Sequence, residues 1–101
     1  MQKLRHDDDL DKAVVVRLAG TFDSIDADEL RIKMEALESG DPAIADLAEL
    51  TTMETTDVDV LIRVNQKRLR SGRSRMQIVN VNPAIGRLLH LRGLARAFDI
   101  Q

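Results

Sequence analysis

The fold of this chain is decided by residues 50–62, which read Leu50-Thr51-Thr52-Met53-Glu54-Thr55-Thr56-Asp57-Val58-Asp59-Val60-Leu61-Ile62. An apolar, strand-like run ends there and an amphipathic helix follows it. Ser, Thr and Asp are favoured at such junctions because their side-chain oxygens accept hydrogen bonds from the unpaired amides of a helix's first turn. The sequence therefore predicts that Thr56 caps a helix over residues 57–71. We also expect this hydroxyl to be exposed, where a partner can read it or a kinase can modify it.

The segments before this junction predict two strands and a helix. Residues 13–19 are largely β-branched, and their nearly continuous apolar character predicts a strand that is buried on both faces. Residues 3–6 predict a short edge strand, antiparallel to the first. Asp26, with Glu29 three residues later, predicts a capping box and a helix that ends at residues 40–42.

The rest of the chain continues the alternation. Residues 43–50 and 76–81 predict strands, and residues 95–100 predict a last short strand. The Asn-Pro pair at positions 82–83 predicts the start of a third helix, with a cap followed by proline at the first position. The order predicts one α/β domain over residues 1–101. We expect a mixed, mostly parallel sheet with an antiparallel N-terminal edge strand and helices packed against it.

The composition excludes several classes of protein. Cysteine is absent, which rules out disulfides and thiolate metal sites and fits a reducing compartment. No apolar run approaches the roughly 18 residues that cross a bilayer, and the N-terminus lacks the apolar stretch of a signal peptide. We therefore expect a cytoplasmic protein without membrane insertion. A net charge of −2 and an aromatic content of 2% argue against a nucleic-acid partner.

The residues that could carry chemistry do not form a recognisable catalytic set. His6 and His90 lie near opposite ends of the chain, and the apolar neighbours of His90 predict a partly buried, structural role. The glycines are isolated, so there is no phosphate-binding loop, and the acidic residues 7–11 lack the spaced glycine and closing glutamate of a calcium loop. We expect no enzyme, no cofactor and no metal. Basic residues cluster at the end of the second helix, where they suit its dipole or an acidic protein partner: Lys67, Arg68, Arg70, Arg73 and Arg75.

Three segments together resemble the STAS domain of bacterial anti-sigma factor antagonists. Residues 14–23, Val-Val-Val-Arg-Leu-Ala-Gly-Thr-Phe-Asp, are similar to the family's strand that ends in Gly-x-Leu-Asp. Residues 47–57 are similar to its Leu-x-x-Leu-x-x-(hydrophobic)-Asp-Ser-Ser/Thr-Gly motif. Residues 81–89, followed by Gly-Leu at 93–94, are similar to its Pro-x-(hydrophobic)-x-x-(hydrophobic) helix. The resemblance covers residues 13–100.

The resemblance implies a partner-switching function in the regulation of transcription. In that family a kinase-type anti-sigma factor phosphorylates the second hydroxyl of the motif. The unphosphorylated antagonist binds this kinase and frees the sigma factor, the phosphorylated form lets go, and a metal-dependent phosphatase resets it. By position the phosphoacceptor is Thr56, with Thr55 beside it. The resemblance implies a partner-binding surface made of Asp23, Met53, Glu54, Thr55, Thr56 and Asp57.

This chain departs from the motif at two positions and leaves two further interpretations open. Glu54 replaces the family's aspartate and Asp57 replaces its glycine, so carboxylates flank the acceptor. One alternative is a divergent binding module that is not phosphorylated and whose acidic rim mimics the modified state. Another follows from the chain's stopping just after its last expected strand, where many antagonists add a helix. Short STAS proteins include small cytoplasmic subunits of lipid-transport ABC complexes, which bind an ATPase.

Overall fold

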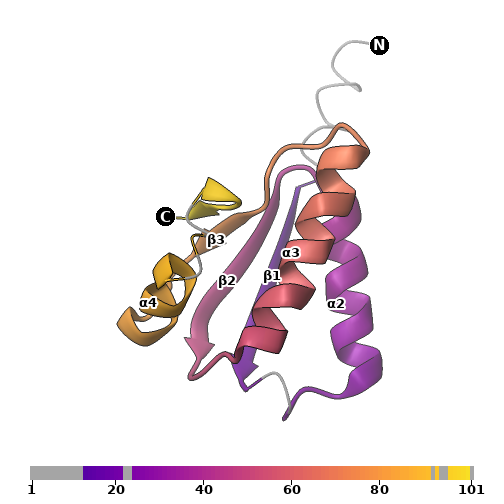
Figure 1. The fold of residues 1–101 in the computed structure, drawn as a ribbon. Helices are drawn as coiled ribbons and strands as arrows, with labels where there is room; N and C mark the ends of the chain where they lie inside the picture. The colour runs from indigo at the N-terminus through magenta and orange to yellow at the C-terminus, as the bar shows by residue number, and fades with distance from the viewer. Residues whose placement is uncertain (1–12, 22–23, 92, 94–95, 101) are drawn as a thin grey trace.

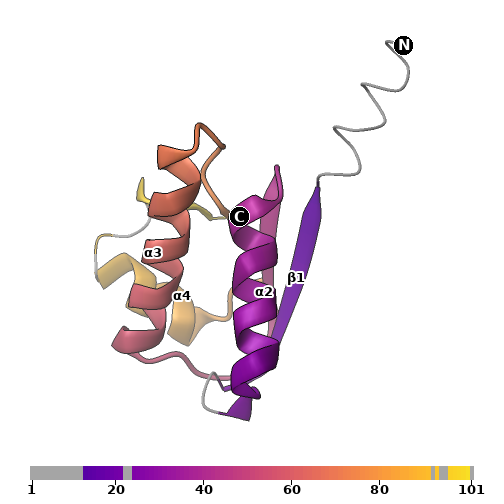
Figure 2. The same cartoon turned by 90° about the vertical axis from the view of Figure 1, so that its right-hand side faces the viewer.

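The computed structural model describes residues 13–21, 24–91, 93 and 96–100 (Figure 1). Its strands are β1 (Val14–Gly20), β2 (Ala43–Leu50), β3 (Gln77–Val79) and β4 (Asp99–Ile100), and its helices are α2 (Ala27–Ser39), α3 (Thr55–Arg70) and α4 (Pro83–Leu91). The three helices lie on one side of the sheet (Figure 2). This two-layer arrangement confirms the predicted α/β fold class.

The described strands form one parallel sheet. Its order is β1-β2-β3-β4, and each neighbouring pair is parallel. Parallel neighbours need crossover connections, which the helices supply. The prediction of a mostly parallel sheet is therefore confirmed, whereas the antiparallel edge strand predicted over residues 3–6 lies outside the described residues. The last strand covers only two residues, Asp99 and Ile100, instead of the predicted 95–100.

The prediction that the first strand is buried on both faces was wrong. Val16 and Leu18 are buried under the helices, but the alternate residues Val15 and Arg17 are exposed, Val15 to 65%. Within the described part of the chain, β1 lies at one edge of the sheet, and the face opposite the helices is bare (Figure 2). A run of aliphatic residues shows no alternation from which an open face could be recognised, and single exposed valines are ordinary on protein surfaces.

The core lies between the sheet and the three helices. In β2, the inward residues Ala43, Ala45 and Leu47 are fully buried. Leu37 of α2 and Leu61 of α3 are also fully buried in the same cluster. Alternate residues of a strand share one face, so this pattern assigns the central strand's small alanines to the helix side, where they let the helices approach closely.

Two helix starts confirm their predicted cap residues, Asp26 and Asn82. The Asp26 carboxylate accepts hydrogen bonds from the amides of Asp28 at 3.1 Å and Glu29 at 3.3 Å. At α4, the Asn82 side-chain oxygen accepts a hydrogen bond from the Ile85 amide at 2.9 Å, and Pro83 is the first helical residue. Both caps satisfy amides that a helix leaves unpaired in its first turn.

The centre of the basic cluster is an interior residue. Arg68 is fully buried, and its guanidinium donates hydrogen bonds to the carbonyl oxygens of Leu37 at 2.7 Å, Ser74 at 3.0 Å and Gly40. Burial lowers the pKa of Arg68 from its ordinary value, and the nearby Asp41 carboxylate opposes this shift. Arg68 therefore joins the end of α2 to the turn after α3 and is not available to an acidic partner.

Candidate functional site

Helix α3 begins at Thr55, two residues earlier than predicted, and Glu54 occupies the N-cap position. The Asp57 carboxylate closes this turn by accepting a hydrogen bond from the Glu54 amide at 2.8 Å. Thr56 therefore lies inside the first turn, and the prediction that it caps the helix was wrong. Because Asp57 at the third helical position reaches back to the amide of Glu54, the helix starts before the threonine pair and not after it.

The two threonines present free hydroxyls at this turn. Both Thr55 and Thr56 are exposed, and in the described ranges neither hydroxyl forms a hydrogen bond. Glu54 is exposed and Asp57 is half-buried. We call residues 54–57 the docking turn. Its geometry presents two hydroxyls and two carboxylates at the first turn of a helix.

The loop that carries the docking turn is fixed on both sides. Met53 is only 9% exposed and packs in the core, so it anchors the loop and contributes little to the surface. The Thr51 amide and hydroxyl both donate to the Gly20 carbonyl oxygen, at 2.8 and 2.9 Å. The Asn82 side-chain amide donates to the Leu50 carbonyl oxygen at 3.1 Å. These contacts of Thr51 and Asn82 were not predicted, because they join segments about 31 residues apart in sequence.

The surroundings of the docking turn are acidic. Helices α2 and α3 start at the same end of the molecule, beside the carboxyl ends of β1 and β2 (Figure 1). Carboxylates are stabilised near the positive end of a helix dipole, which accounts for their enrichment there. Asp23, predicted to join the partner-binding surface, lies outside the described residues. The described carboxylates of the two helix starts are Asp26, Asp28, Glu29, Glu54, Asp57 and Asp59.

A second polar cluster lies on the bare face of the sheet. The pKa of Asp46 is lowered, mainly because the Asn80 side-chain amide donates to its carboxylate at 3.0 Å and the Ala48 amide donates at 3.0 Å. The Arg17 guanidinium, 3.5 Å away, adds to the shift, which burial opposes. The β1–β2 register shifts just after Asp46, so this carboxylate supports an irregular stretch of β2.

The remaining predicted candidates are dispersed. His90 is exposed, which corrects the prediction that it is partly buried in α4. His6 and the acidic residues 7–11 lie outside the described residues. Among the side chains that the structure describes, no group of three or more His, Cys, Asp or Glu residues could hold a metal ion. No described helix is long and apolar enough to cross a membrane.

A family model described as "Mlab, STAS domain" matches residues 6–100, which is nearly the whole chain. The matched range contains all three segments whose motifs resemble the STAS pattern, at residues 14–23, 47–57 and 81–94. No curated protein matches the chain.

Proposed function

Because this chain belongs to the STAS domain family, we propose that it is a protein-binding module that switches partners and catalyses no reaction itself. The carrying observation is the docking turn, where two exposed hydroxyls lie on a helix start whose loop is anchored by buried Met53. The proposed partner is a kinase-type anti-sigma factor in the cytoplasm. Binding of this factor through residues 54–57 would free its sigma factor.

Thr56 is the proposed phosphoacceptor of this switch, with Thr55 as the second candidate. A phosphate on the first turn of α3 would meet the positive end of the helix dipole, which favours it. It would also meet the carboxylates of Glu54 and Asp57, which repel it. A dianionic group added there disfavours a fitted interface, so modification would release the partner.

The position of Asp57 favours a second candidate function. Its carboxylate already closes the first turn of α3 by accepting from the Glu54 amide, so the turn is complete without a phosphate. A STAS module that is not phosphorylated would keep this arrangement permanently. Its partner would then be of another kind, such as the ATPase of a lipid-transport ABC complex.

Phosphate transfer to the docking turn distinguishes these candidates. The purified protein would be incubated with a kinase-type anti-sigma factor and ATP, and its intact mass and its affinity for that factor would be measured. We expect wild type to gain one phosphate and to lose affinity. Thr56→Val keeps the branched shape without the hydroxyl and should gain none, whereas the matched control Thr55→Val should be modified like wild type.

The alternative outcomes are equally specific. Tight binding of an ABC ATPase without phosphate transfer would favour the second candidate. Phosphate on a double variant that combines Thr55→Val with Thr56→Val would place the acceptor elsewhere. Binding to neither class of protein would overturn partner switching as the function.

A further inference from the structure

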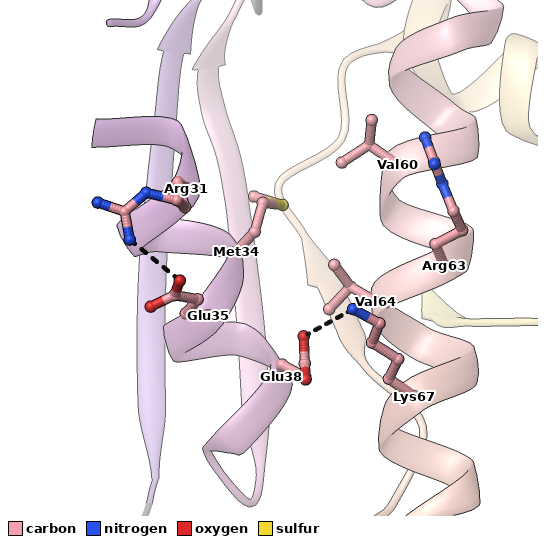
Figure 3. Close-up of a pocket in the computed structure, with 8 residues that line it drawn as sticks. All are labelled: Arg31, Met34, Glu35, Glu38, Val60, Arg63, Val64 and Lys67. Carbon is pink, nitrogen blue, oxygen red and sulfur yellow. Dashed lines mark hydrogen bonds and ion pairs between the residues drawn. The ribbon is translucent and has the colours of Figure 1, made fainter. Parts of the chain in front are cut away.

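A groove of about 300 Å³ runs between α2 and α3 (Figure 3). Met34 from α2 and Val60 and Val64 from α3 point toward one another across its floor. Met34 and Val64 are 8% and 7% exposed, so the floor is apolar and well packed. Charged side chains form the rim: Arg31, Glu35, Glu38, Arg63 and Lys67.

The rim has one cation that the groove does not neutralise. Arg31 pairs with Glu35 along α2 at 3.1 Å, and Lys67 pairs with Glu38 across the groove at 3.8 Å. Arg63 forms no ion pair with any residue of the described chain. The excess positive charge of the groove therefore lies at Arg63, one turn from Val60 on α3.

The groove continues the docking turn along the same face of α3. Four residues of α3 are spaced four, three and four positions apart, which places them in one stripe of the helix: Thr56, Val60, Arg63 and Lys67. At a rise of 1.5 Å per residue, Arg63 lies about 10 Å along the helix axis from Thr56. A segment of a partner that contacts the docking turn can therefore reach the groove without changing direction.

We propose that the α2–α3 groove binds a segment of the protein partner that carries an apolar side chain and a neighbouring carboxylate. This inference rests on the proposed function and names the chemistry of its partner. The apolar side chain would cover Val60, and the carboxylate would pair with Arg63, whose planar guanidinium suits a carboxylate in bidentate geometry. An open groove with an apolar floor and a charged rim matches the way amphipathic segments dock between helices.

The charges around the groove also determine the direction in which the partner's segment lies along α3. The docking turn and the start of α2 are acidic, whereas the groove is basic at Arg63. A complementary segment therefore places its basic residues at the helix starts and its acidic residue in the groove. Reversal of this direction would put like charges together at both ends.

Selection from a random peptide library displayed on phage tests the proposal. We expect the enriched peptides to combine an apolar residue with Asp or Glu. Synthetic versions should bind wild type in titration calorimetry and should lose about tenfold or more in affinity for Arg63→Glu. Changing the peptide's acidic residue to Lys should restore binding to Arg63→Glu. Arg87→Glu, an equal charge change at an exposed site on α4, is the matched control.

Several results would overturn the proposal. Enriched peptides without a carboxylate, or peptides that bind Arg63→Glu as well as wild type, would exclude this site. A concentration-dependent dimer that Arg63→Glu abolishes in sedimentation equilibrium would assign the groove to a second copy of the chain. Arg63→Gln removes the charge without reversing it and should weaken binding to a smaller extent. This variant tests the proposal even if Arg63→Glu does not fold.

The outcome is independent of the phosphate-transfer experiment. Thr56→Val should bind the selected peptides like wild type, because its substitution leaves Val60 and Arg63 unchanged. Failure of the groove would therefore leave phosphate transfer at Thr56 intact, and failure of phosphate transfer would leave the groove intact.

Discussion

At the start of α3, Asp57 occupies the position of the glycine in the motif that the chain resembles. Its carboxylate is turned back to the Glu54 amide and closes the first helical turn. The acidic substitution therefore has a structural use that is independent of any partner. An Asp57→Gly variant would lose this bond as well as a negative charge, so its binding would report both effects together.

The effects of alanine substitutions on the free energy of unfolding should distinguish the structural role of Asp57 from that of Thr56. Asp57→Ala should lower it by about 0.5–1.5 kcal/mol, because the Glu54 amide loses its acceptor. Thr56→Ala removes an exposed hydroxyl without a hydrogen bond, so it should change stability by less than about 0.5 kcal/mol. Urea denaturation measures both values. A larger loss for Thr56→Ala than for Asp57→Ala would contradict the helix start described above.

The burial of Arg68 could not be predicted from the sequence. It lies within a run of cations that resembles a solvated helix end, and only the tertiary structure brings the carbonyls of Leu37 and Gly40 against it. A buried guanidinium is recognised by its acceptors, and here the carbonyls of Leu37 and Gly40 lie 31 and 28 residues away in sequence. The composition and the periodicity of the sequence do not indicate these acceptors.

Replacement of Arg68 should be costly. Arg68→Met keeps an unbranched stem but leaves buried carbonyl oxygens without donors, and we expect a loss of about 2–5 kcal/mol in unfolding free energy. Arg70→Met, an exposed change two residues later, should stay within about 0.5 kcal/mol. Thermal and urea unfolding of both variants provide the comparison. Equal stabilities would show that Arg68 is not needed to join α2 and α3.

Among the elements, those fixed by local chemistry were predicted well. Asp26 and Asn82 cap their helices because a short polar side chain bonds to amides two or three residues away. The strand over residues 43–50 was also predicted with its observed bounds. The predictions for β1 and for the start of α3 were wrong for two reasons. The burial of β1 depends on which elements pack against it, and the start of α3 depends on the Asp57 side chain, which bonds back to the Glu54 amide. The exposure of the threonine pair could be predicted from the sequence, but the burial of Met53 could not.

Two glycines test how closely the elements pack. A Cβ added at Gly40 would lie 2.5 Å from Val14 Cγ2, whereas one added at Gly86 in α4 would lie 3.6 Å from Val81 Cγ1. Gly40→Ala should therefore destabilise the protein by about 1–3 kcal/mol through overpacking between the end of α2 and β1. Gly86→Ala should stabilise it by about 0.5–1 kcal/mol, because alanine is the better helix former. Changes of the same sign in thermal unfolding would contradict this packing.

At the scale of the molecule, alternation of strands and helices was enough to predict an α/β fold with a mostly parallel sheet. It could not show that the described helices all cover the same face, because connections to either face give the same order of elements. On the bare face, Asp46 joins β2 to Arg17 of β1 and to Asn80 just after β3. This carboxylate therefore links three parts of the sheet through one ionised group.

The stability of the whole molecule should depend on pH through Asp46. Its pKa is lowered in the folded protein from 3.8, so its ionised form stabilises the fold above pH 3.8 and this contribution is lost as the pH falls through the folded value. Asp46→Asn removes this titration. The difference in unfolding free energy between wild type and Asp46→Asn should shrink below pH 3.8. A difference that stays constant from neutral to acidic pH would contradict the role assigned to Asp46.

The order of the described strands also governs how the sheet can be assembled during synthesis. Because β1, β2, β3 and β4 are neighbours in chain order, each newly made strand meets the free edge of the one before it. Strands therefore leave the ribosome in the order in which they pair, and none has to be inserted between two that are already joined. The β1–α2–β2 unit can form while β3 and β4 are still being translated. Removal of β4 would expose a new edge of the sheet without separating the strands that remain.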